Sequence, residues 1–87
     1  MDEKRLLEIY KRYAKTKGYR LNPDQDAINM LIEGQLNNEM KYGYRYCTCK
    51  VRTGDEVRDA KIICPCATHT EEIEEMGRCW CGLFLKA

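Results

Sequence analysis

The residues most able to do chemistry in this chain are its six cysteines. All follow residue 46, and they form three Cys-x-Cys pairs: Cys47-Thr48-Cys49, Cys64-Pro65-Cys66 and Cys79-Trp80-Cys81. Clustered thiols suit metal ligation, disulfide chemistry or both. The pattern therefore predicts a metal or redox site built from the C-terminal half of the chain.

Three kinds of cysteine chemistry compete for this pattern. A structural disulfide scaffold would allow fifteen pairings of six cysteines, but the N-terminus shows no signal-peptide pattern, and cytosolic thiols keep such bonds reduced. A structural zinc site in a module without turnover needs four ligands, usually from pairs spaced by two to four residues, whereas each pair here is spaced by one. A 4Fe-4S cluster also takes four thiolates, and the remaining two cysteines then make one redox-active disulfide. This division uses every cysteine, although the spacing does not say which two are spare.

Composition limits the partners of such a site. The chain has 87 residues, 15 Lys and Arg against 14 Asp and Glu, and a formal net charge of +1. Nucleic-acid binding normally needs a strong basic bias, and a membrane span needs about 18 consecutive apolar residues. We therefore expect one small cytoplasmic domain over residues 1–87 that binds neither nucleic acid nor membrane.

Two amphipathic helices are expected before the first cysteine. Apolar residues at helical spacing predict the first over 2–17, ending at Gly18. Asn22 is the expected cap of the second, with Pro23 in its first turn and Gln25 completing a capping box; it should end near Asn37. The expected buried stripes are Leu6, Ile9, Tyr10, Tyr13 and Ala14 in the first helix, and Ala27, Ile28, Leu31, Ile32 and Leu36 in the second.

The segments around the cysteines look shorter and less regular. Alternating aromatic residues over 41–46 indicate an extended segment or an irregular wrap without a partner strand. Helices are expected over 53–62 and from 68–70 to Met76, the latter with a Thr68 and Glu71 capping box. The acidic run 71–75 is interpreted as a solvated helix face. The fold class is thus mainly α, with 1–40 as a helical support for a cluster and disulfide site in 41–87.

The motifs resemble those of a known family. Three Cys-x-Cys pairs with a central Cys-Pro-Cys are similar to the ferredoxin:thioredoxin reductase catalytic subunit, and the likeness extends upstream through 18–24 and 41–47. The compact length resembles archaeal and bacterial ferredoxin:disulfide reductases. The resemblance implies an iron-sulfur oxidoreductase that takes electrons from ferredoxin or another one-electron donor and reduces thioredoxin- or glutaredoxin-like proteins.

The resemblance also assigns roles to the cysteines. It implies that Cys47, Cys64, Cys66 and Cys79 ligate a 4Fe-4S cluster, and that Cys49 and Cys81 form the redox-active disulfide. Cys49 would be the more exposed thiol that attacks the partner, and Cys81 the thiol that interacts with the cluster. Cluster and disulfide must then touch.

Two positions depart from the family pattern. Thr48 stands where the first motif commonly has Pro, and Trp80 stands where the plant-type third motif has a His thought to help proton transfer. His69, the only histidine, is the candidate to replace that catalytic function. The alternative for His69 is a surface residue beside a helix cap, and the alternative for Trp80 is apolar cover of the cluster.

Overall fold

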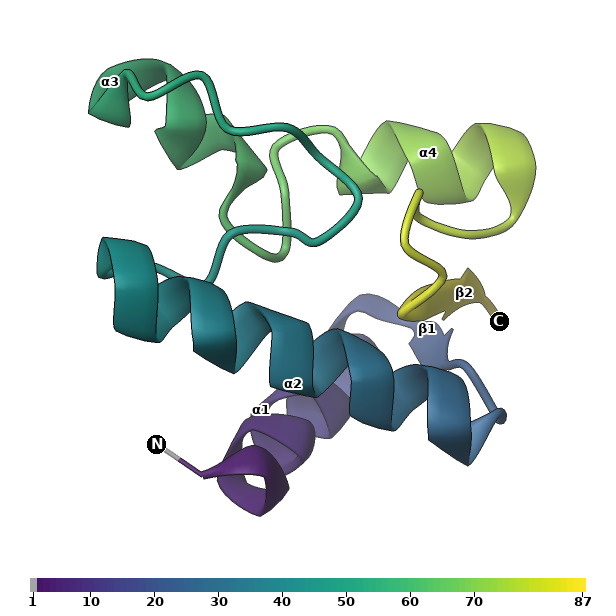
Figure 1. Cartoon of the computed structure of the whole chain (residues 1–87). Coiled ribbons are helices and arrows are strands. Elements are labelled where there is room, and N and C mark those ends of the chain that lie inside the picture. Colours follow the sequence, from purple (N-terminus) through teal and green to yellow (C-terminus); the bar gives the residue numbers. More distant parts are fainter. Residues whose placement is uncertain (1) are drawn as a thin grey trace.

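The computed structural model describes residues 2–87, and within them four α-helices, one 3-10 helix and a two-stranded sheet. A first layer holds the two long helices, and the short helices lie across the cysteine-bearing loops from it (Figure 1). This confirms the mainly α fold class. In chain order the elements are α1 (Glu3–Lys17), β1 (Tyr19–Leu21), α2 (Gln25–Tyr42), α3 (Glu56–Asp59), η1 (Ala60–Ile62), α4 (His69–Met76) and β2 (Phe84–Lys86).

Helix α1 forms where the sequence predicted it. The Asp2 carboxylate accepts a hydrogen bond from the Arg5 backbone N–H at 2.7 Å, and the helix ends at Gly18, whose φ of 77° is left-handed. Its buried residues are Leu6, Tyr10 and Ala14. Ile9 is 38% exposed, so its place in the expected core was wrong.

Helix α2 begins and ends later than expected. Its cap is Asp24, whose carboxylate accepts from the backbone N–H groups of Asp26 and Ala27. Asn22 instead accepts from the Asp24 N–H at 2.9 Å, so the predicted Asn22 and Gln25 capping box was wrong. The helix runs on to Tyr42 rather than ending near 37. Only the end of the 41–46 segment pairs, through a single bridge between Tyr46 and Ile63.

The short sheet was not predicted. β1 and β2 pair antiparallel, with Tyr19 opposite Lys86 and Leu21 opposite Phe84. The pairing brings the chain's end back to the connection between α1 and α2. It also inserts the Phe84 ring between the two layers, 5.7 Å from the Tyr10 ring and 5.2 Å from the Tyr13 ring.

The hydrophobic core joins the two parts of the chain. It contains cysteines as well as aliphatic and aromatic residues, so the candidate site is continuous with the core. Its buried members are Leu6, Tyr10, Ala14, Ile28, Ile32, Cys64, Ile73, Cys79, Leu83 and Phe84. Ala27, Leu31 and Leu36 of the expected α2 stripe are only partly buried.

The short helices follow the predicted ranges but not all the predicted caps. Asp55 caps α3, which continues as η1, and α4 ends at Gly77 as expected. The capping box of Thr68 with Glu71 was wrong, because the Thr68 hydroxyl donates to Glu72 instead. Among residues 2–87, no helix is both long and apolar enough to cross a membrane.

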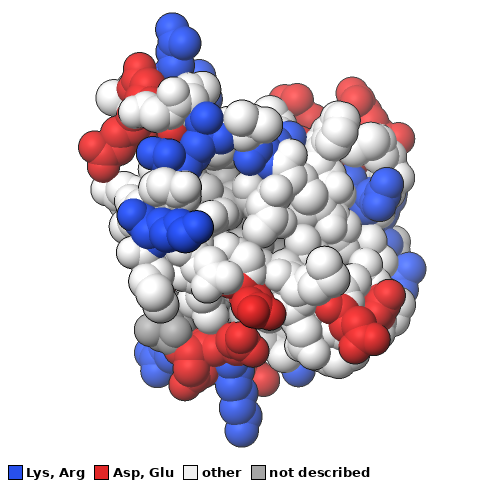
Figure 2. Space-filling model, in the orientation of Figure 1, with Lys and Arg blue, Asp and Glu red and all other residues white. Residues whose placement is uncertain are grey.

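Figure 2 shows the face on which α2 lies below the cysteine-bearing loops and the short helices. Uncharged side chains fill the middle of this face, and charged side chains of both signs lie mainly around its rim. The middle of this face is therefore suited to contacts that are not dominated by charge.

Candidate metal and disulfide site

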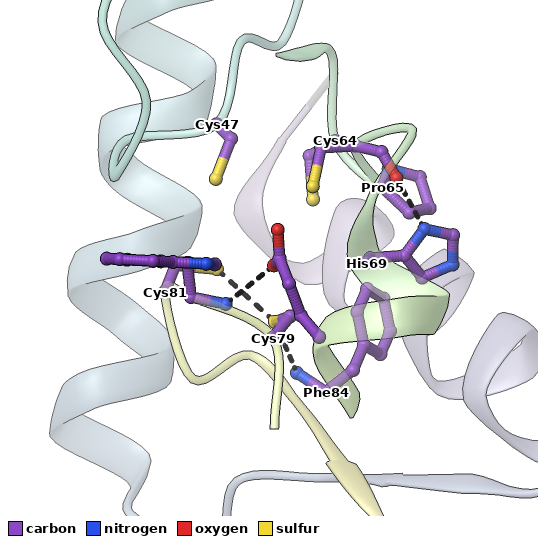
Figure 3. Close-up of a pocket in the computed structure, with 10 residues that line it drawn as sticks. Cys47, Cys64, Pro65, His69, Cys79, Cys81 and Phe84 are labelled. Atoms are coloured by element: carbon purple, nitrogen blue, oxygen red, sulfur yellow. Dashed lines mark hydrogen bonds between the residues drawn. The ribbon is translucent and has the colours of Figure 1, made fainter. Parts of the chain in front are cut away.

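Backbone pairing of two loops places the first two cysteine motifs side by side. The Cys47 N–H donates to the Ile62 carbonyl at 2.7 Å, and the Cys64 N–H donates to the Arg45 carbonyl at 2.9 Å. These bonds flank the bridge between Tyr46 and Ile63. The peptide bond from Cys64 to Pro65 is cis. The Cys47 and Cys64 side chains therefore point into the same cavity from two different loops (Figure 3).

The third motif reaches the same enclosure through a tight turn before β2. The Cys79 N–H donates to the Phe84 carbonyl at 3.0 Å, and the Phe84 N–H donates to the Cys79 sulfur at 3.4 Å. Gly82, with φ of 77°, lets the chain reverse within this turn. The sheet between β1 and β2 thereby fixes the position of Cys79.

One cavity collects five of the six cysteines. The four expected cluster ligands, Cys47, Cys64, Cys66 and Cys79, are all buried, and the half-buried Cys81 completes the sulfur lining. The remaining lining residues are Pro65, His69, Glu72, Trp80 and Phe84. Cys49 is exposed and lies outside the cavity lining.

Cys81 lies between the buried sulfurs and the exposed one. Its sulfur is 3.6 Å from that of Cys79, and the sulfurs of Cys47, Cys49 and Cys81 all lie within 4.8 Å of one another. No disulfide joins any of the six cysteines in the described part of the chain. This group of three sulfurs can itself hold a metal ion. It combines one expected cluster ligand, Cys47, with the two cysteines expected to form the disulfide.

The thiols of the site differ in acidity. Hydrogen bonding from the Cys81 thiol lowers the pKa of Cys47 to about 7 and that of Cys79 to about 6, and backbone N–H groups of the following turn add to the effect at Cys79. Hydrogen bonding with Cys47 and Cys79, followed by burial, raises the pKa of Cys81 itself. Burial, followed by the charge of Cys47, raises the pKa of Cys49.

Cys64 shows how this donor set fits a cationic group. Burial raises the pKa of its thiol to about 12, so it keeps its proton near neutral pH without a bound cation. Coordination to a metal removes such a proton outright. Four buried cysteine sulfurs around one enclosure are the ligand chemistry of zinc and of iron-sulfur clusters.

Sequence reasoning missed Glu72, which lies in the site rather than on a solvated face. This residue is 7% exposed, so the interpretation of the acidic run was wrong at this position. Its carboxylate accepts from the Lys50 ammonium at 2.8 Å, from the Trp80 backbone N–H at 2.9 Å and from the Thr68 hydroxyl at 2.5 Å. The available signal was helical spacing, since residues 69, 72, 73 and 76 share one face of α4.

Glu72 therefore contacts a residue in or near each of the three cysteine motifs. Lys50 follows Cys49, Trp80 lies between the cysteines of the third motif, and Thr68 comes two residues after Cys66. Burial raises the pKa of Glu72, but the hydrogen bonds from Lys50, Thr68 and Trp80 outweigh it and leave this pKa below its ordinary value of 4.5. One ionised carboxylate thus ties the three loops together.

His69 lines the cavity, and the structure gives both of its ring nitrogens a partner. Nδ1 bonds to the Cys66 carbonyl, which only accepts, so Nδ1 carries a proton. Nε2 bonds to the Tyr13 hydroxyl. The half-buried ring thus connects α1 to the central cysteine motif.

Trp80 lines the cavity with part of its surface and presents the rest to solvent. It is 60% exposed, and the Lys50 ammonium lies 5.1 Å from the centre of its ring. It therefore forms part of the surface beside Cys81 as well as part of the cavity wall.

Comparison with known proteins bears on this arrangement. The model of the family described as ferredoxin thioredoxin reductase catalytic beta chain matches residues 2–87. The chain belongs to this family. Membership identifies it as a disulfide reductase, hence an oxidoreductase, of an iron-sulfur family, and it agrees with the resemblance in the cysteine motifs. No individual curated protein matches the chain.

Proposed function

We propose that this protein passes single electrons from ferredoxin, or another low-potential donor, through a 4Fe-4S cluster to a dithiol that reduces thioredoxin- or glutaredoxin-like disulfides. The observation that carries the proposal is the position of Cys81. Its sulfur lies 3.6 Å from buried Cys79 and within 4.8 Å of exposed Cys49. A thiol in this position connects a buried metal site with a partner at the surface.

The proposed cluster ligands are Cys47, Cys64, Cys66 and Cys79, whose buried sulfurs line one cavity. When bound, a 4Fe-4S cluster supplies one electron at a time to the sulfur chemistry beside it. The lowered pKa values of Cys47 and Cys79 favour the thiolate form that ligation needs. The buried Phe84 ring and part of Trp80 line the same cavity and give it apolar walls.

Cys49 and Cys81 carry out the proposed thiol exchange. The Cys49 thiolate attacks one sulfur of the partner's disulfide, forming a mixed disulfide and releasing the other partner sulfur as a thiolate. The Cys81 thiolate then attacks the Cys49 sulfur, which releases the second partner thiolate and leaves a Cys49–Cys81 disulfide. Two electrons from the donor, delivered singly, and two protons restore the dithiol.

His69 acts on this site through Cys66 in the proposal. Its Nδ1–H holds the carbonyl of a proposed ligand residue, and Tyr13 orients the other side of the ring. The transfer of protons by His69, expected from the sequence, stays a prediction.

Metal content tests the cofactor. Anaerobically purified protein is expected to contain about four irons and four acid-labile sulfides per chain, as a cubane with four thiolate ligands requires. The measurement is elemental and sulfide analysis, with zinc determined on the same sample. One zinc per chain without labile sulfide, in protein expressed with adequate iron, would contradict the reductase function and support a structural zinc-binding module.

Cysteine variants test the dithiol. Cys81→Ser is expected to accumulate a mixed disulfide with an acceptor through Cys49, because the resolving thiol is gone, while Cys49→Ser forms none. Both variants should keep their iron, and Thr48→Ser, in the same motif, serves as the control that keeps full turnover. An equal loss of iron in both variants would show that these cysteines are ligands and would contradict the proposed division.

A further inference from the structure

Two buried polar side chains lie in the apolar interface between α1 and α2. Tyr10 is 2% exposed and Gln35 is fully buried. Each sits in the buried stripe of its helix, Tyr10 between Leu6 and Ala14, and Gln35 after Ile28 and Ile32. Polar groups in such positions destabilise the fold unless they have hydrogen-bond partners, so their presence requires an explanation.

The hydrogen bonds of this pair are incomplete. The Tyr10 hydroxyl donates to Gln35 Oε1, and this uses its only hydrogen. Gln35 Nε2 is buried and has no hydrogen-bond partner. The amide thus keeps donors that no group among the described residues accepts.

The Cys64 sulfur lies beside this pair, and Cys64 and Tyr10 belong to the same core cluster. Burial has the larger effect on the pKa of Cys64 and raises it, whereas the Gln35 side chain acts in the opposite direction and favours the thiolate. A neutral thiol is a weak acceptor, whereas a thiolate is a charged and stronger one. The unused donor therefore matches the form that Cys64 takes as a metal ligand.

We propose that Gln35 Nε2 donates an N–H···S hydrogen bond to Cys64 when this residue ligates the cluster, and that this bond raises the cluster's reduction potential. Tyr10 is a positioning residue in this proposal, because its hydroxyl holds Gln35 Oε1 and leaves Nε2 as the free donor of the amide. The inference rests on the proposed function, since it needs the cluster.

The direction of the effect follows from charge. Reduction adds one negative charge, which is shared with the ligand sulfurs, so a hydrogen-bond donor stabilises the reduced form more than the oxidised form. The surroundings are apolar, and such interactions are stronger there than in water. Removal of the donor should therefore make the potential more negative.

The test is a redox titration of the iron-loaded protein, followed by its visible and electron paramagnetic resonance spectra. Gln35→Met keeps the length of the side chain and removes its donors, and Gln35→Glu keeps the shape and places an acid beside the sulfur. Both are expected to shift the midpoint potential to more negative values at unchanged iron and sulfide content. Tyr10→Phe should shift it in the same direction by less.

Gln25→Met is the matched control, because Gln25 lies on the same helix with an exposed side chain that bonds to Asn29. Its potential should equal that of the unaltered protein. Iron-loaded Gln35→Met and Gln35→Glu with the potential of this control would overturn the inference and leave the proposed function standing. Unaltered protein without iron and sulfide would overturn both.

Discussion

Glu72 holds together residues from all three cysteine-bearing segments. Glu72→Gln removes the ion pair with Lys50 and leaves a half-buried ammonium without its partner, while the amide oxygen can still accept from the Trp80 N–H. We expect the free energy of unfolding to fall by about 2 kcal/mol, the usual size for a hydrogen bond to a charged group. Urea denaturation under anaerobic conditions measures it. Glu71→Gln, the exposed neighbour, should change it by less than about 0.5 kcal/mol.

The same carboxylate predicts a dependence of stability on pH. Because the folded-state pKa of Glu72 lies below its ordinary value of 4.5, its contribution is complete above that value and is lost as the pH falls through the folded-state pKa. The difference in urea midpoint between the unaltered protein and Glu72→Gln should be constant from pH 7 to about 5 and then shrink. A difference that grows on acidification would contradict an ionised Glu72.

At the scale of elements, the glycine inside α2 sets how closely the first cysteine loop approaches. A Cβ at Gly34 would lie 2.6 Å from the Thr48 side-chain methyl, far inside contact distance. Thr48 lies between Cys47 and Cys49, so relief of this contact requires either rotation of the Thr48 side chain or a shift of the loop that carries both sulfurs. Glycine inside a helix costs about 1 kcal/mol relative to alanine. The close approach of Thr48 explains why α2 has a glycine at position 34.

Gly34→Ala is accordingly expected to lower iron content and to destabilise the fold by about 1–3 kcal/mol, as overpacking does, despite the better helix propensity of alanine. Thr48→Ser removes the methyl group in question. In the Thr48→Ser background, Gly34→Ala should instead stabilise by up to about 1 kcal/mol. Iron content and urea midpoints are measured for the unaltered protein, the two single variants and the double variant. Equal effects of Gly34→Ala in both backgrounds would refute the contact.

The elements also show what local sequence can and cannot predict. Helix α1 was predictable because its apolar period and its terminal glycine agree, and the three Cys-x-Cys pairs predicted a site in the C-terminal half of the chain. The β1–β2 pair was not predictable, because each strand has only three residues and more than sixty residues separate the paired positions along the chain. Glu72 was missed for a similar reason: its partners, Lys50 and the Trp80 N–H, become neighbours only when the loops fold together.

For the whole molecule, the question is how much of the fold depends on the metal. The short helices α3 and α4 have four and eight residues, fewer than the 12–15 that an isolated helix needs to be even marginally stable. Of the two, only α4 contributes to the core, through Ile73, and both lie among the loops that carry cysteines 47, 64, 66 and 79. The long helices α1 and α2 pack on each other, and Leu83 and Phe84 join this core without metal.

Removal of the metal should therefore loosen one part of the molecule first. After iron is removed by chelation under anaerobic conditions, hydrogen exchange with peptide-level mass spectrometry is expected to show lost protection over 44–81 and retained protection in α1 and α2. The physical reason is that metal-sulfur bonds close these loops, and without them the chain entropy of the loops is no longer restrained. Protein kept in its metal-loaded form through the same handling is the control. Protection lost at one rate along the whole chain would instead mean that Cys64 and Cys79, as members of the shared core, make folding of the long helices depend on the metal as well.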